Sequence, residues 1–118
     1  MKVTAFNPAL VTNNPDESIG FFKKLGFKII KKLTFDSVND IEYILENESG
    51  QRMDIVYDEK IQKNMNVCRI NVDDFDEAVN IFSEHGFKFI IEPLVTKTSK
   101  VVAFETPNHY IIFILQEF

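Results

Sequence analysis

The sequence lacks most of the residues around which small proteins commonly build a reactive site. Tryptophan is absent, cysteine occurs once and glycine only four times in 118 residues. A single cysteine excludes an intrachain disulfide, and four glycines leave no glycine-rich phosphate loop. No apolar run approaches the length of a membrane span, and residues 1–6 carry no signal-peptide pattern. We therefore expect a cytoplasmic protein without a membrane partner.

Charge and aromatic content are those of a small globular domain. The net charge is −5, and the lysines are scattered along the chain rather than gathered on one helix face. Since nucleic-acid binding needs a basic footprint, we expect no nucleic-acid partner. Twelve phenylalanines indicate an aromatic-rich core or pocket.

One stretch occurs twice, at residues 14–30 and 74–90, without a gap. Identities this frequent are unusual in a short window and indicate an internal repeat. The identical pairs are Asp16/Asp76, Glu17/Glu77, Phe22/Phe82, Gly26/Gly86, Phe27/Phe87, Lys28/Lys88 and Ile30/Ile90.

Each copy of the repeat predicts a helix followed by a strand. Asn14 and Asp74 are good N-cap residues, and a glutamate follows each of them three positions later, as in a capping box. Gly26 and Gly86 stand where a left-handed residue ends a helix, and apolar residues recur before them at helical spacing. Period-two alternation then begins, which is typical of a strand.

The rest of the chain extends each copy into the order strand–helix–strand–strand–strand. We predict a first module at residues 1–57, a linker at 58–64 and a second module at 65–118. Residues 37–40 predict a turn, and Pro93 is expected to interrupt a strand. The predicted helices are 15–25 and 75–85, and the predicted strands are 5–12, 27–36, 41–46, 51–57, 65–72, 87–92, 100–105 and 110–116.

Three segments resemble a known family. They are Glu17-Ser18-Ile19-Gly20-Phe21-Phe22-Lys23-Lys24-Leu25-Gly26-Phe27, the second Gly86-Phe87, and Phe104-Glu105-Thr106-Pro107-Asn108-His109-Tyr110. With the two-module order, they make the chain resemble the glyoxalase/bleomycin resistance protein/dioxygenase group, the vicinal oxygen chelate superfamily. The resemblance implies one α+β glyoxalase-like domain over residues 1–118, with two βαβββ modules forming a curved mixed sheet around a cleft. It also implies a homodimer, in which strand edges would be covered.

Enzymes of that family hold a divalent metal with residues from four strands. By the resemblance, these positions fall on Asn7, Asp54, Val67 and Phe113. Val67 and Phe113 offer no donor atom, and Cys68 is the sole alternative donor near either of them. A divalent ion needs several N, O or S ligands, so we expect no metal cofactor.

The two histidines do not supply the missing ligands. His85 ends the second predicted helix, where a positive charge suits the helix dipole. His109 lies in the predicted turn before the last strand, and a turn residue that tolerates unusual backbone angles is the simpler interpretation.

Strand alternation predicts which side chains face the cleft. On one predicted strand, Cys68, Ile70 and Val72 would pack toward a helix. The residues that alternate with them would therefore face the cleft. As an alternative to binding a ligand, Asp54 and Arg69 could pair with each other across the sheet, with the cleft filled by side chains. Glu42 and Tyr43 are weaker candidates, because the facing of their strand is ambiguous. The predicted ligand-binding residues are Asn7, Arg52, Asp54, Val67, Arg69 and Phe113.

Three functions fit these residues. The first is metal-free binding of a small hydrophobic or cationic molecule in a largely apolar cleft. The second is an enzyme, either a metal-dependent lyase or dioxygenase or one that uses Asp54 as a general base. The third is a structural or regulatory module with a vestigial cleft.

Overall fold

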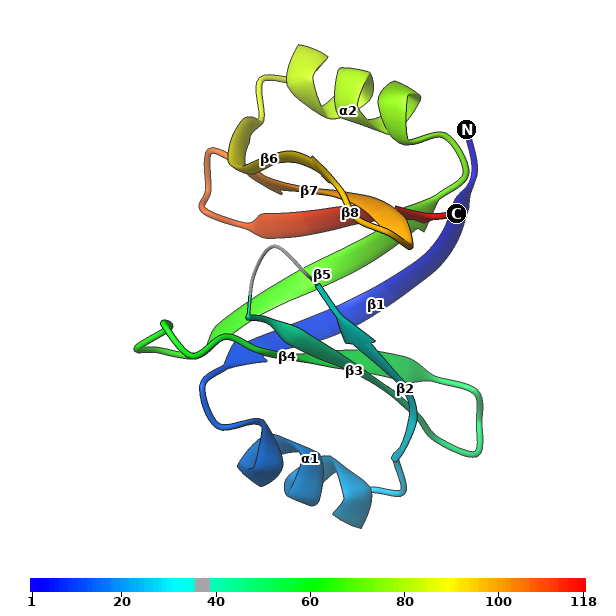
Figure 1. Ribbon diagram of the computed structural model, residues 1–118, viewed down its shortest axis with the longest axis vertical. Helices are drawn as coiled ribbons and strands as arrows, with labels where there is room; N and C mark the ends of the chain where they lie inside the picture. Colours follow the sequence, from blue (N-terminus) through cyan, green and yellow to red (C-terminus); the bar gives the residue numbers. More distant parts are fainter. Residues whose placement is uncertain (36–38) are drawn as a thin grey trace. The chain divides into compact units, whose positions relative to one another are not determined.

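The computed structural model describes residues 1–35 and 39–118 (Figure 1). Each half has the expected strand–helix–strand–strand–strand order, which confirms the α+β class. The predicted strand end Asp36 and the predicted turn residues Ser37 and Val38 lie outside the described residues. The elements are β1 (Val3–Thr12), α1 (Pro15–Lys24), β2 (Lys28–Thr34), β3 (Ile41–Glu46), β4 (Arg52–Tyr57), β5 (Met65–Val72), α2 (Phe75–Glu84), β6 (Lys88–Val95), β7 (Ser99–Glu105) and β8 (Ile111–Glu117).

The chain packs as two compact units. The first unit is residues 7–66, and the second unit is residues 1–6 together with 67–118. Strand β1 contributes its first residues to the second unit and the remainder to the first unit. The module boundaries expected at residues 57 and 65 stay a prediction.

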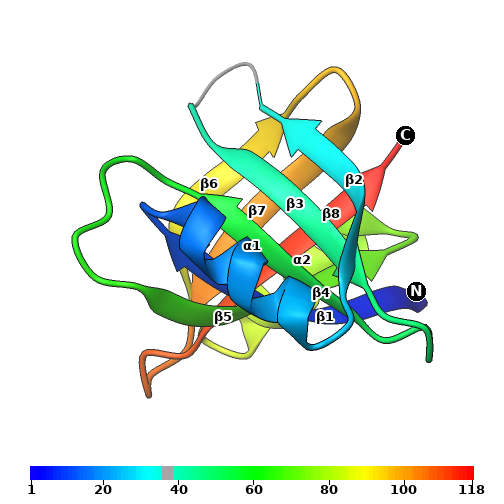
Figure 2. The same cartoon turned by 90° about the horizontal axis from the view of Figure 1, so that it is seen from below.

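In the first unit the strands lie in the order β2-β3-β4-β1. Strands β1 and β4 are parallel, and the other neighbours are antiparallel. Helix α1 lies across one face of these strands (Figure 2). Its apolar side meets that face in a core of Ile19, Leu45, Met53 and Ile55, with Phe22, Phe27 and Tyr43 packed around it.

The second unit repeats this arrangement with the order β5-β8-β7-β6 and a parallel β5–β8 pair. Helix α2 covers one face of the strands (Figure 1). The core between them consists of Cys68, Val72, Phe75, Ala78, Val102, Phe104, Ile112 and Ile114. Ile70 packs against this core, so the prediction that Cys68, Ile70 and Val72 pack toward a helix is confirmed.

Both helices begin and end as their local sequence predicts. The side chains of Asn14 and Asp74 each accept a hydrogen bond from the backbone N–H three residues later, at 3.4 and 3.0 Å. Gly26 and Gly86 have φ of 96° and 89°, in the left-handed region that favours glycine. In the described part of the chain, no helix is long and apolar enough to cross a membrane.

Strand β6 continues through Pro93 to Val95, beyond the expected interruption. Proline is tolerated there because β6 is the last strand of its unit, so a missing N–H on the outer side breaks no ladder bond. The pairing with β7 is irregular between Phe89 and Ile91 and again between Ile91 and Leu94. The proline is thus accommodated in a bulged edge strand.

Candidate functional site

The strands of the first unit turn alternate side chains toward α1 and away from it. Those that point toward the helix belong to the core, including Tyr43 and Leu45 of β3 and Met53 and Ile55 of β4. The alternate residues of the three neighbouring strands share the opposite side, as the strand registers show. We call this side the helix-distal face of the first unit, and it consists of Asn7, Ala9, Glu42, Ile44, Asp54 and Val56.

A buried amide–carboxylate pair lies on this face. Asn7 Nδ2 donates a hydrogen bond of 3.1 Å to Asp54 Oδ1. The exposed fractions of the two residues are 4% and 0%. A hydrogen bond to a carboxylate is stronger than one between neutral groups, so this bond helps to hold the carboxylate in place. Two of the predicted residues, 47 positions apart, are thereby brought together.

Glu42 adds a second carboxylate, which the predicted site omits. It is 5% exposed and pairs in register with Val56, while Asp54 pairs with Ile44. Glu42 and Asp54 are therefore diagonal neighbours on adjacent strands of one face. The sequence left the facing of this strand ambiguous. The structure decides it, because Tyr43 packs in the helix-facing core and its neighbour Glu42 therefore lies on the opposite side.

Arg52 lies on β4, two residues from Asp54, but its side chain is exposed and forms an ion pair with another residue. Its Nε forms an ion pair of 3.2 Å with Glu46 Oε1, its register partner on β3. Exposed pairs of this kind contribute little to stability. The structure thus places Arg52 at the solvent-exposed end of the β3–β4 pair.

The second unit has a corresponding face on the side of its strands away from α2. Arg69 of β5 pairs in register with Phe113 of β8, one residue on from the core pair Cys68 and Ile112. Arg69 and Val67 are buried, at 4% and 5% exposure. The structure therefore brings predicted residues together in each unit. Pairing of Asp54 with Arg69 stays a prediction.

Cys68 is a buried core residue rather than an exposed thiol. A hydrogen bond with Cys68 raises the pKa of Tyr110 above the usual tyrosine value. Because Cys68 is surrounded by the α2 core, we assign it a packing role.

The residues at the family's metal positions do not fit a divalent ion. Val67 and Phe113 have no donor atoms, and the amide nitrogen of Asn7 is directed to Asp54. Over residues 1–35 and 39–118, no three His, Cys, Asp or Glu side chains are grouped closely enough to hold a metal. We therefore derive no chemistry through a metal at these positions.

Both histidines occupy the local positions that their sequence context predicts. His85 is the C-cap residue of α2, and its ring meets Phe87 edge to face at 5.1 Å. His109 has φ of 63°, and its Nδ1 lies 3.4 Å from Glu105 Oε2. The turn interpretation of His109 is thus confirmed by its backbone angle.

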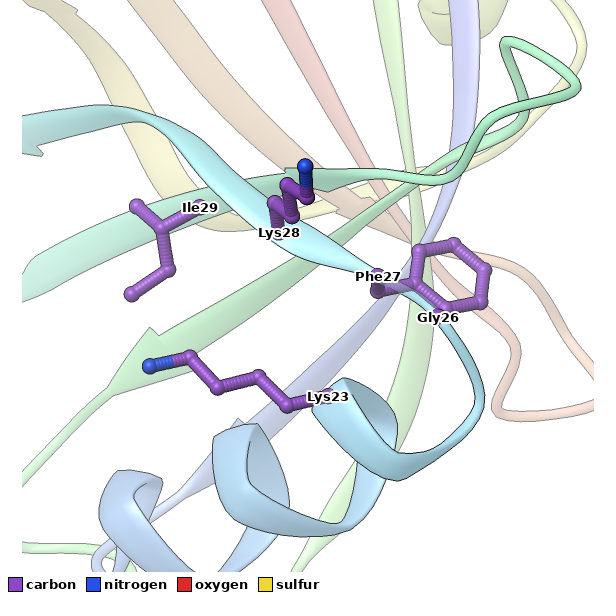
Figure 3. A pocket seen from close by; sticks show the side chains of 5 residues that line it. All are labelled: Lys23, Gly26, Phe27, Lys28 and Ile29. Carbon is purple, nitrogen blue, oxygen red and sulfur yellow. The ribbon is translucent and has the colours of Figure 1, made fainter.

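A shallow surface depression of about 470 Å³ lies at the end of α1 in the first unit. It is lined by Lys23, Gly26, Phe27, Lys28 and Ile29, and it contains none of the predicted site residues. Figure 3 shows that Lys23 and Lys28 extend in different directions and do not converge on one point. The helix-distal faces remain the better candidates, because their polar side chains are buried within apolar surroundings.

The fold is shared with several solved structures of low sequence identity. A protein from Legionella pneumophila, described as an NAD-dependent benzaldehyde dehydrogenase, is 16% identical with a TM-score of 0.72, covering 97% of this chain and all (100%) of that one. Methylmalonyl-CoA epimerase from Mycobacterium tuberculosis is 13% identical with a TM-score of 0.73, covering 97% and 88%. A Staphylococcus aureus protein is 12% identical with a TM-score of 0.71, covering 100% of both chains. At these identities the likeness shows the fold alone.

Sequence comparison supplies the family. No curated protein matches the sequence. The model of the glyoxalase/bleomycin resistance protein/dioxygenase superfamily, however, matches residues 5–114, nearly the whole chain. That match agrees with the repeated strand–helix–strand–strand–strand order and with the fold of the similar structures. The chain belongs to the glyoxalase/bleomycin resistance protein/dioxygenase superfamily.

Proposed function

We propose that the protein binds a small, largely apolar molecule with a cationic group, without a metal, on the helix-distal face of the first unit. The observation that carries the proposal is the buried Asn7–Asp54 bond beside a second buried carboxylate, Glu42. Small-molecule sites usually combine apolar walls with a few well-placed polar groups.

The polar groups favour a cation with several N–H donors. Asp54 and Glu42 are diagonal neighbours, so one planar amidinium or guanidinium group could approach both carboxylates. Such contacts are strengthened where little water competes for them. Asn7 would hold Asp54 in place as the cation binds.

The rest of the face suits the apolar part of such a ligand. Ala9 and Ile44 are the register neighbours of Asp54 on either side, and Val56 is the register neighbour of Glu42. Ala9, Ile44 and Val56 provide aliphatic contact for the body of the ligand. The arrangement predicts selectivity for a cation attached to an aromatic or aliphatic body.

The test is thermal unfolding of chelator-stripped protein with benzamidine and, as a neutral control of equal shape, benzamide. A ligand at one hundred times its Kd stabilises a protein by about 2.7 kcal/mol, a shift of several degrees for a domain of this size. We expect a shift with benzamidine, none with benzamide, and loss of the shift in Asp54→Asn. Glu48→Gln, which removes one charge from an exposed turn, should keep it.

A metal titration separates this proposal from a metalloenzyme. Ni²⁺, Zn²⁺, Mn²⁺ and Fe²⁺ should each leave the unfolding temperature of the stripped protein unchanged. A metal-induced shift that disappears in Asp54→Ala would overturn metal-free binding.

A second candidate function is proton transfer without a metal, with Asp54 as the general base. Two buried carboxylates on one face favour it, since acid–base chemistry needs groups positioned in this way. Methylmalonyl-CoA epimerases share the fold, so methylmalonyl-CoA in D₂O is a suitable probe. Deuterium incorporation that is lost in Asp54→Asn would establish this second candidate. No incorporation would leave ligand binding as the function of the face.

A further inference from the structure

We propose that the end of α1 and the start of β2 in the first unit form a docking surface for an anionic lipid membrane. Residues 20–32 carry five lysines and no acidic residue, although the whole chain has 18 Asp and Glu against 13 Lys and Arg. A basic segment on an acidic protein attracts a negatively charged partner. The expectation of no membrane partner came from the lack of a spanning segment, which binding at a membrane surface does not require.

The internal repeat shows that this charge is not required by the fold. Residues 80–92 occupy the equivalent positions of the second unit and form the same helix end, glycine and strand. They carry one lysine, Lys88, and two acids, Glu84 and Glu92. The formation of the helix end and the strand therefore does not explain the five lysines of the first copy.

Exposed apolar side chains lie among these lysines. Phe21 and Leu25 are 53% and 58% exposed. They are four residues apart at the end of α1, so they lie on one side of the helix, and Lys24 is an exposed neighbour of both. Large apolar side chains beside lysines are typical of protein surfaces that enter the boundary between lipid headgroups and acyl chains.

The lysines suit many separate anionic groups better than one bound anion. Within residues 1–35 and 39–118, Lys23, Lys24 and Lys28 form no ion pair. Lys23 and Lys28 line the depression at the end of α1 and extend in different directions (Figure 3). Fixed carboxylates of a protein partner are bound best by the fork of arginine, whereas lysine is a flexible point charge. The two arginines of the chain, Arg52 and Arg69, lie in other strands, so the surface favours mobile lipid headgroups.

Co-sedimentation of the full chain with lipid vesicles tests the proposal. We expect binding to phosphatidylcholine vesicles that contain about 30% phosphatidylserine, and none to phosphatidylcholine alone. Lys24→Gln should lower the partition coefficient roughly fivefold, because a lysine near an anionic surface contributes about 1 kcal/mol. Phe21→Ser should lower it by roughly the same factor, because the ring no longer enters the membrane.

Lys63→Gln and Ile81→Ser are the matched controls. Lys63 is an exposed lysine of the first unit outside this surface, and Ile81, which is 45% exposed, is the equivalent of Phe21 in the second copy. Both variants should bind within about twofold of the wild type. Thermal unfolding checks that every variant is folded. Absence of binding to the anionic vesicles, binding that Lys24→Gln or Phe21→Ser leaves unchanged, or tighter binding to soluble polyglutamate would each overturn the proposal.

Discussion

The bond from Asn7 Nδ2 to Asp54 Oδ1 joins two strands through a buried carboxylate. A buried acceptor has given up its hydrogen bonds to water. If the amide that donates to it is removed, that loss is no longer compensated and the protein becomes less stable. The stability of the first unit should therefore depend on Asn7 more strongly than on an exposed asparagine.

Asn7→Ala should lower the free energy of unfolding by about 1–3 kcal/mol, because Asp54 loses a hydrogen bond in a buried position. Urea denaturation measures the change. Asn64→Ala, at an exposed position, is the control and should stay within about 0.5 kcal/mol of the wild type. An equal response of the two variants would contradict the structural role of the Asn7–Asp54 bond.

A second residue-scale prediction concerns Asp40. Burial, followed by the charge of Asp58, raises the pKa of Asp40 above its usual value of 3.8. The folded state thus holds this proton more tightly than the unfolded state, so stability falls as the pH rises from 3.8 through the folded pKa. Asp40→Asn should raise the unfolding temperature at pH 7 by roughly one degree, with a smaller gain below pH 3.8. A gain of the same size at pH 3 and pH 7 would exclude titration of Asp40 as its cause.

At the scale of elements, a glycine with positive φ follows the C-cap residue of each helix. A side chain at such a position is strained even where space is free, and no atom lies within 4 Å of a Cβ built on Gly26. The cost of substitution there is conformational rather than steric.

Gly26→Ala should therefore destabilise the protein by about 1 kcal/mol. Gly20 offers the matched comparison, because it is exposed inside α1, has no positive φ and has equally open surroundings. Gly20→Ala should stabilise by about 0.5–1 kcal/mol through its better helix propensity. Changes of opposite sign in the unfolding temperatures of the two variants would confirm that the cost at Gly26 comes from its positive φ. Changes of the same sign would refute it.

At the scale of the whole molecule, the repeat in the sequence corresponds to two units of the same arrangement, each with one helix packed on its strands around its own apolar core. The residues of the two cores differ, so the repeat preserves the pattern of apolar positions rather than the side chains themselves.

The structure shows which conclusions were available from sequence alone. The caps at Asn14 and Asp74, the glycine helix ends and the α+β repeat depend on contacts within a few residues, so local chemistry was enough to predict them. The helix-facing core also followed, because strand alternation has a period of two.

Tertiary structure alone decided how distant residues meet. The facing of Glu42, its place beside Asp54 and the Asn7–Asp54 bond all depend on the registers of β1, β3 and β4, which join parts of the chain far apart in sequence. Pro93 remained within β6 because that strand lies at an edge, a fact set by strand order rather than by neighbouring residues. The sequence therefore determined the elements and the family, and the strand registers decided which polar side chains share one buried face.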